Sequence, residues 1–401
     1  MAGLIAACEA LMTRQRALIV AVMLVPVMMA VEALTIWADP ALRGHLPFGH
    51  DFGAFWSAAR LTALGAHEAL YDPARFWAEQ APVSVRPGFL SWHYPPTFLL
   101  FLLPLAGLGF AAAWLVFSAG GIAALAVAGR RVLPVPGLLG WAALLGAPVI
   151  GVTLVQGQNG AWVAAALIGG LWARERGRGW LAALLFACLA AKPHLALLLP
   201  LALVAARDWR LIGQTALMVG GLIGLSVAVL GVAPWQLFWA HRDTVQVVMA
   251  DREVLAQMPT AFAASLIAGL PMRVALMAQG LSALLAGVVV WRVWADPKAA
   301  PDLKIAVLLM AALLLPPYGF RYDLVLQLGA VLLLARIACR DGWLFGEKLV
   351  LAALWAGPAL FPPLAYATPM QAGFLLQLLG LWAVWRRFGV PTQPNGTPAA
   401  P

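Results

Sequence analysis

Three short polar stretches interrupt long apolar runs, and they hold residue types that could do chemistry. In chain order they contain Gln156, Gln158 and Asn159; Lys192 and His194; and Arg321 and Asp323. Ammonium and guanidinium groups bind phosphate oxygens or pair with carboxylates. Amides hydrogen-bond to hydroxyl groups, but the flanking glycines equally describe a tight turn that caps two helices. Both interpretations stay open for each stretch.

Acidic residues gather in the segment before these stretches. Asp51 precedes an apolar run of helical spacing, and Asp72 precedes Pro73. Such positions are typical of helix caps and turns, although a carboxylate can also accept a proton. His93 and Tyr94 precede Pro95-Pro96; an interfacial tyrosine is ordinarily a membrane anchor, and His93 is a candidate phosphate or sugar contact.

The composition indicates that lipid surrounds most of the chain. Of its 401 residues, 63% are apolar and only 11% are charged, whereas soluble domains carry about 25% charged residues. The formal charge of +9 does not indicate nucleic acid, because the basic residues sort to one side of a membrane. Three isolated cysteines suggest neither a zinc site nor a disulfide framework.

Apolar runs between the polar interruptions predict about twelve membrane spans. They cover 17–37, 96–128, 138–155, 160–173, 179–191, 194–206, 211–231, 272–294, 304–317, 322–338, 348–362 and 369–387. With both ends cytoplasmic, most of the 26 lysines and arginines lie inside, as the positive-inside rule requires. The run 96–128 fits either one tilted span or a re-entrant segment followed by a span.

Function is expected on the outer face, where the two long loops 38–95 and 232–271 lie. The first is predicted to form two short amphipathic helices in the interface. The runs on either side of Lys192 give only about 20 Å of helix each, against a bilayer core of about 30 Å. Lys192 should therefore lie below the outer surface. Non-helical backbone at that depth needs protein or a water-filled cavity around it, so the three polar stretches are predicted to converge in one funnel.

The sequence therefore predicts an all-α polytopic membrane protein. We expect a cytoplasmic N-terminus over residues 1–16, one transmembrane domain over 17–388, and a disordered cytoplasmic tail over 389–401.

Several short motifs also carry a family resemblance, which runs from about residue 50 to 338. They are His50-Asp51-Phe52, Ala58-Ala59-Arg60, Leu70-Tyr71-Asp72-Pro73, Tyr94-Pro95-Pro96, Leu103-Pro104-Leu105, Gly157-Gln158, Lys192-Pro193-His194, Met258-Pro259-Thr260 and Tyr322-Asp323-Leu324. Their order resembles family 87 of the glycosyltransferases, which includes polyprenol-phosphomannose-dependent mannosyltransferases of the GT-C type.

The resemblance implies an inverting enzyme that takes a mannose-like hexose or a pentose from a polyprenyl-phosphate donor. The acceptor would be a lipid or a glycan, at the outer face of a bacterial inner membrane. It implies Asp51 as the base, with helix capping as the alternative and Asp72 as the reserve. Donor phosphate contacts are expected from Lys192, Arg321, His93 and His194. Sugar or acceptor contacts are expected from Gln156, Gln158, Asn159, Tyr94, Asp323 and Asp72. No metal, cofactor or nucleic acid is expected.

Two other classes of protein would also be polytopic. A transporter or lipid flippase would have short broken helices and a midplane charge, but its halves usually match, and no second Lys-Pro break stands in a corresponding place. A membrane scaffold would not need three converging polar stretches. The transferase is therefore the favoured interpretation.

Overall fold

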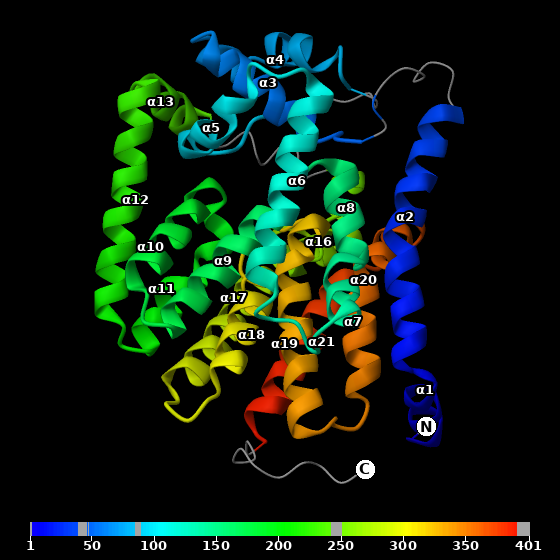
Figure 1. The fold of residues 1–401 in the computed structure, drawn as a ribbon. Helices are drawn as coiled ribbons and strands as arrows, with labels where there is room; N and C mark the ends of the chain where they lie inside the picture. The colour runs from blue at the N-terminus through cyan, green and yellow to red at the C-terminus, as the bar shows by residue number, and fades with distance from the viewer. Residues whose placement is uncertain (1, 39–45, 47, 85–89, 242–250, 391–401) are drawn as a thin grey trace.

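The computed structural model describes residues 2–38, 46, 48–84, 90–241 and 251–390, and all regular structure in these ranges is helical. Upright helices form a bundle, and several short helices lie across its upper end (Figure 1). The prediction of an all-helical protein is confirmed for the described residues, and the bundle is consistent with a polytopic membrane protein.

Six helical segments are long and apolar enough to cross a membrane. They are α2 (Arg14–Ala38), α6 (Phe110–Gly129), α12 (Trp209–Leu230), α17 (Met272–Ala295), η6 (Arg321–Leu324) with α19 (Val325–Asp341), and α20 (Glu347–Ala367). A seventh would be α7 (Leu138–Leu145) and α8 (Pro148–Gln156) taken together, which are bent by 48° at their junction.

The other predicted spans are also helical, but they are shorter. They are α5 (Pro96–Leu102) with η2 (Leu103–Leu105), α9 (Gly160–Glu175), α10 (Gly179–Cys188) with η3 (Leu189–Ala191), η4 (Pro193–Ala196) with α11 (Leu198–Ala205), α18 (Pro301–Ala311), and α21 (Ala372–Phe388). The run 96–128 is divided, because the chain breaks between η2 and α6. The count of twelve crossings stays a prediction.

Short helices occupy both long loops between the spans. The first loop contains α3 (Phe52–Ala63), η1 (His67–Leu70) and α4 (Pro73–Gln80). The second contains α13 (Ala233–Ala240), α15 (Arg252–Ala256) and α16 (Ala261–Ile267). Nine residues of α3 are buried, so protein covers more of this helix than the single apolar face that was expected. Its location at a membrane interface stays a prediction.

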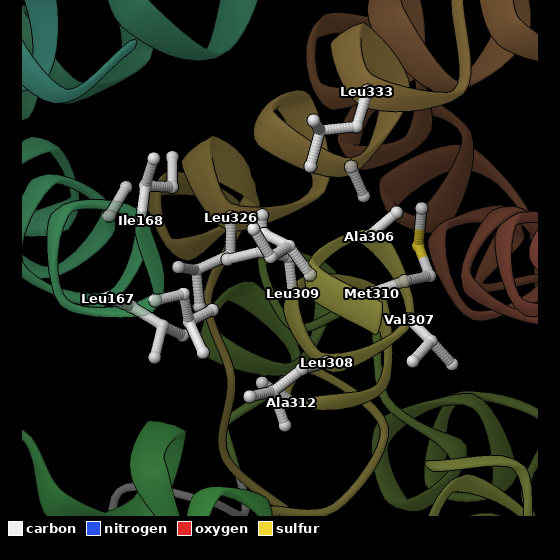
Figure 2. Close-up of a cluster of buried hydrophobic side chains, with 14 of the residues drawn as sticks. Leu167, Ile168, Ala306, Val307, Leu308, Leu309, Met310, Ala312, Leu326 and Leu333 are labelled. Carbon is white, nitrogen blue, oxygen red and sulfur yellow. The ribbon is translucent and has the colours of Figure 1, made fainter. Parts of the chain in front are cut away.

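Helices α18 and α19 form the centre of the bundle. The 18-residue apolar window of η6 and α19 is 83% buried, and every residue of α18 from Ile305 to Ala311 is buried. Figure 2 shows part of the buried cluster that Leu308 and Leu309 form with Leu167 of α9 and Leu326 of α19. Because protein surrounds these helices, their polar ends need no contact with lipid.

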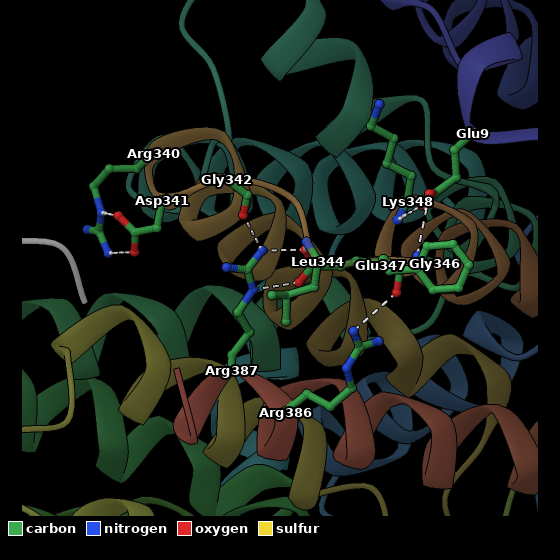
Figure 3. A network of polar contacts seen from close by, with 11 residues as sticks. Glu9, Arg340, Asp341, Gly342, Leu344, Gly346, Glu347, Lys348, Arg386 and Arg387 are labelled. Atoms are coloured by element: carbon green, nitrogen blue, oxygen red, sulfur yellow. Dashed lines mark hydrogen bonds and ion pairs between the residues drawn. The ribbon is translucent and has the colours of Figure 1, made fainter. Parts of the chain in front are cut away.

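Charged groups join the lower ends of several helices. Arg387 at the end of α21 forms a buried ion pair with Glu347 at the start of α20, and it also donates to the Gly342 carbonyl at 2.8 Å. Glu9 of α1 (Ala2–Leu11) accepts from the backbone of Lys348 at 3.0 Å. Figure 3 shows these contacts together. Residues 391–401, which make up most of the predicted tail, lie outside the described part of the chain.

The charge distribution gives a testable membrane orientation. In a variant with Cys8, Cys188 and Cys339 replaced by alanine, single cysteines would be placed at exposed positions, namely Leu64, Glu253, Arg176 and Lys298. An impermeant maleimide added outside intact cells should label positions 64 and 253 only, because the loops with positions 176 and 298 are predicted to be cytoplasmic. The reverse labelling pattern would contradict the orientation.

Candidate active site

The three polar stretches meet beneath the short helices at the upper end. The Lys192 ammonium donates to Asp323 Oδ1 at 2.6 Å and to Asn159 Oδ1 at 3.4 Å. The side chain next to Asn159, Gln158, donates to Asp51 Oδ2 at 2.8 Å. Four parts of the chain that are far apart in sequence therefore meet in a small volume. We call these residues, Asp51, Gln158, Asn159, Lys192 and Asp323, the polar network.

Glycines allow the α8–α9 turn to approach its neighbours closely. Gly157 ends α8 in the left-handed region at φ 70°, and an added Cβ would lie 2.6 Å from Cβ of Phe52. An added Cβ on Gly160 would lie 2.2 Å from the Tyr322 carbonyl oxygen. The glycines thus serve the turn, as one of the two interpretations held. The amides do not cap the next helix, because Asn159 makes no side-chain cap to α9; they belong to the polar network.

Backbone contacts hold Asp51 against the end of α8. Its N–H donates to the Gln156 carbonyl at 2.9 Å, and the Gly49 N–H donates to the Val155 carbonyl at 2.7 Å. Asp51 occupies the N-cap position of α3, but its backbone is already helical and its carboxylate makes no cap hydrogen bond. The capping alternative is therefore not what the structure shows. The carboxylate instead accepts from Gln158.

An aromatic cluster fixes the helix that carries Asp51. Phe55 of α3 packs edge-on against Phe98 at 5.1 Å and Tyr94 at 5.2 Å, and Phe52 lies 5.3 Å from Phe117. Phe52 and Phe55 are fully buried. Aromatic pairs of this kind add about 0.5–1.5 kcal/mol each beyond the area they bury. The position of α3 against α5 and α6 is thereby defined by packing.

The break between η3 and η4 positions Lys192. Pro193 follows it, and the Lys192 backbone is non-helical at φ −142°, ψ 65°. Thr97 of α5 donates to the Ala190 carbonyl at 3.0 Å, which ties this break to the upper layer. The Lys192 side chain is 3% exposed and Asp323 is 1% exposed. The ion-paired state, which the sequence left open as the alternative to phosphate binding, is the arrangement observed.

The third stretch is held from two sides. The Arg321 N–H donates to the Gln257 carbonyl at 2.9 Å, so the second long loop contacts η6 directly. Asp323 Oδ2 accepts from the Phe320 N–H at 3.0 Å. Arg321 is half-buried and begins the same short turn that carries Asp323. Arg321 is therefore only two positions along the chain from Asp323, which belongs to the polar network.

Tyr94, His93 and His194, which were predicted as site residues, differ in their contacts. Tyr94 has Asn159, Asp51 and Asp323 among its electrostatic neighbours. His93 shares a 2.6 Å hydrogen bond with Ser91, and burial lowers the pKa of His93 to about 4. The ring is therefore neutral at pH 7 and can serve a phosphate only as an uncharged donor. His194 packs edge-on against Tyr318 at 4.9 Å.

Asp72 is placed elsewhere, at the start of α4. Its Oδ1 accepts from the N–H groups of Ala74 at 3.0 Å and Arg75 at 3.2 Å. This is the ordinary geometry of an N-cap. Within the described residues, the Asp72 carboxylate hydrogen-bonds only to the first turn of α4. Gln156, the last residue of α8, accepts from the Asp51 N–H through its backbone carbonyl.

One residue at the site was not singled out from the sequence. Tyr322 is buried, and its ring centre lies 4.6 Å from the Lys192 ammonium, within cation–π range. Its signals in the sequence were its place between Arg321 and Asp323 and its part in the Tyr322-Asp323-Leu324 motif. In the described part of the chain, no three His, Cys, Asp or Glu side chains gather closely enough to hold a metal ion.

Comparison with known proteins gives one match. A family model described as glycosyltransferase family 87 matches residues 92–317, which is more than half of the chain. The matched range includes Gln158, Asn159 and Lys192, whereas Asp323 lies just after it and Asp51 lies well before it. No curated protein and no solved structure matches. The matched family agrees with the resemblance carried by the motifs, and the chain belongs to glycosyltransferase family 87.

Proposed function

We propose that this membrane glycosyltransferase is an inverting enzyme that takes a mannose-like hexose or a pentose from a polyprenyl-phosphate donor. The acceptor is a lipid or glycan hydroxyl at the outer face of a bacterial inner membrane. The observation that carries the proposal is the contact of Asp51, through Gln158 and Asn159, with the buried Lys192–Asp323 pair. The Asp51 carboxylate thus contacts the amide of Gln158, and the buried Lys192 ammonium contacts the amide of the next residue, Asn159.

The reaction is a single displacement at the anomeric carbon. The acceptor oxygen attacks this carbon, Asp51 takes the hydroxyl proton, and the bond to the phosphate oxygen breaks. The bonding electrons leave with the polyprenyl phosphate. Attack opposite the leaving group inverts the anomeric configuration. Gln158 orients the base through its 2.8 Å hydrogen bond to Oδ2.

The leaving phosphate gains charge as the bond breaks, and nearby cations stabilise that charge. Lys192 carries three N–H donors, of which Asp323 and Asn159 each accept one. We propose that Lys192 serves the phosphate while Asp323 holds it in place. Arg321, two residues from Asp323, is the second cation, and its guanidinium geometry suits phosphate oxygens. Neutral His93 is proposed as an uncharged donor to the phosphate, and His194 is proposed as a further contact.

Sugar and acceptor hydroxyls are proposed to contact Tyr94 and the amides of Gln156, Gln158 and Asn159. Buried amide atoms of Gln156, Gln158 and Asn159 have no hydrogen-bond partner among the described residues. Buried polar atoms are normally satisfied, so a ligand with hydroxyl groups would supply partners that the protein alone does not. A direct substrate contact by Asp72 is not proposed, because both of its hydrogen bonds serve α4.

Membership of a glycosyltransferase family favours this function over a transporter or a flippase. The proposal of a polyprenyl-phosphate donor rests on two further features. The site lies among apolar helices that suit a lipid carrier, and its cations suit the single phosphate of such a donor.

Replacing Asp51 with asparagine tests the base. Asp51→Asn keeps the shape of the side chain but cannot take the acceptor proton, so transfer should fall about 10² to 10⁴-fold while donor binding persists. Purified protein would be assayed with a radiolabelled polyprenyl-phosphate sugar. Asp72→Asn is the matched control, because asparagine caps a helix as well as aspartate, and it should remain active. An active Asp51→Asn enzyme beside an inactive Asp72→Asn enzyme would move the base to Asp72.

Lys192→Gln tests the phosphate contact. The variant should use the donor at least about tenfold less well, because it loses a charge-assisted contact of about 1.5–3 kcal/mol. Asp323→Asn is the informative partner, since it also breaks the ion pair but keeps the ammonium. It should retain more donor use than Lys192→Gln at equal folded fraction. Lys348→Ala, at the lower end, should behave as the unchanged protein.

Thermal unfolding separates the two roles of Lys192. Removing either partner of a buried pair costs about 3–5 kcal/mol of stability, so both variants should melt earlier. If Lys192→Gln and Asp323→Asn lose donor use to the same extent for the same loss of stability, then Lys192 is a structural residue and the phosphate contact is wrong.

A further inference from the structure

A basic pocket lies at the end of the bundle opposite Asp51. Its cavity of about 480 Å³ is lined by the α9–α10 turn and by the start of α12. In Figure 1, α12 begins at the lower end of the bundle and rises toward α13 near the upper layer. The pocket therefore takes no part in the polar network around Lys192.

The charges of the pocket favour an anion. Arg174, Arg178 and Arg210 line it together with one acid, Asp208. The acid is already engaged, because its Oδ2 accepts from Arg174 at 2.9 Å and its Oδ1 accepts from the Leu211 N–H at 3.3 Å. Within the described chain, the guanidinium of Arg210 makes no hydrogen bond or ion pair. Arg178 likewise has no carboxylate partner among the described residues, and its guanidinium lies at the edge of cation–π range, 6.0 Å from the Trp172 ring centre. Both arginines therefore keep charge beside the cavity that no acid compensates.

A buried amide adds a second, independent feature. Gln214 lines the pocket and is only 7% exposed, yet its amide makes no hydrogen bond to another described residue. It reaches the first residue of α10, since an added Cβ on Gly179 would lie 2.4 Å from Gln214 Oε1. Buried amides are normally hydrogen-bonded. A ligand with oxygen acceptors would satisfy its N–H group.

The start of α10 also places backbone N–H groups at the edge of the same cavity. Gly179, Trp180 and Leu181 begin this helix and line the cavity. The first N–H groups of any helix lack intrahelical acceptors, and Arg178 at the N-cap position gives no side-chain cap. Helix N-termini favour anions such as phosphate. The arginines, the Gln214 amide and the start of α10 therefore all suit an anionic ligand with oxygen acceptors.

The surroundings of the pocket indicate that the anion is attached to a lipid. Trp180 is 51% exposed and Trp209 is 62% exposed, and each belongs to a helix that borders the cavity. Helix α12 has only 11% of its apolar window buried within the protein, so its outer surface is available to acyl chains. Tryptophan is enriched where a membrane meets water, and basic pockets between helices bind acidic headgroups.

We propose that this pocket binds the phosphate group of an anionic phospholipid, with Arg178, Arg210 and Gln214 as its contacts. Phosphate oxygens accept from the two guanidinium groups and from the Gln214 amide, and the acyl chains extend along α12. A zwitterionic lipid carries the same phosphate together with a cationic ammonium group, which the arginines of the pocket would repel.

The test is the thermal stabilisation of the full-length protein in a neutral detergent. Dioleoyl phosphatidylglycerol, dioleoyl phosphatidylcholine and inorganic phosphate would be titrated separately. Phosphatidylglycerol should raise the melting temperature in a saturable manner, and the other two should not. The Arg178→Gln/Arg210→Gln variant should bind it about 30-fold more weakly, since each basic residue contributes about a factor of five. Arg292→Gln, an exposed arginine outside the pocket, is the matched control and should leave binding unchanged.

Three results would overturn the proposal. Equal stabilisation of the unchanged protein and the double variant would exclude the pocket. Equal loss in Arg292→Gln would indicate general surface charge, and stabilisation by inorganic phosphate at similar concentrations would indicate a soluble anion. If the double variant does not fold, Arg210→Gln alone decides the matter, because this side chain contacts no other described residue by hydrogen bond or ion pair. It should weaken phosphatidylglycerol binding about fivefold, and unchanged binding would refute the site.

Discussion

The buried contact between Lys192 and Asp323 is the interaction on which the site depends. Both side chains lie in the apolar interior, where an isolated charge would be very costly. Their 2.6 Å ion pair meets this constraint only if the η3–η4 break and η6 lie side by side. Asn159 adds a third segment at 3.4 Å. A charge requirement in the interior therefore brings three distant parts of the sequence together.

The same requirement explains the shortened helices. Chain breaks expose carbonyl and N–H groups, which are tolerated at membrane depth only within protein. The break after α18 is satisfied in this way, because Gln279 of α17 donates to the carbonyls of Leu314, Leu315 and Pro316 at 2.9–3.1 Å. Thr260 donates to the Pro317 carbonyl at 3.0 Å. Side chains from neighbouring elements thus replace the hydrogen bonds that a continuous helix would have made.

Much of this arrangement could be predicted from the sequence. Each predicted span contains helix, because apolar runs bounded by charges are a strong signal. Two short runs on either side of Lys192 predicted that it is recessed; the structure shows that Lys192 is buried within the protein, and its depth in a membrane stays a prediction. The sequence also left 96–128 open between two interpretations, and the structure has a short helix followed by a long one. Gly107 and Gly109 lie at that break.

Other features depend on tertiary contacts that periodicity does not contain. Asp51 precedes an apolar helix in the way a cap does, but the approach of Gln158 gives its carboxylate a partner outside that helix. Asp72 has the same local pattern and is a cap. The burial of α3 on most sides comes from aromatic residues of α5 and α6, which are far away in sequence. Tyr322 was not predicted as a site residue, because its contact with the Lys192 ammonium depends on the fold and an aromatic residue in a span is ordinarily an anchor or a core residue.

The most direct measurement of the central claim is the stereochemistry of the transfer. Purified protein would be given a panel of polyprenyl-phosphate sugars of defined anomeric configuration, with nucleotide sugars in parallel, and the product would be analysed by NMR. The account predicts transfer from a polyprenyl-phosphate sugar only, with the anomeric configuration inverted in the product. Retention of configuration would contradict a single displacement with Asp51 as its base, and transfer from a nucleotide sugar alone would contradict the polyprenyl-phosphate donor.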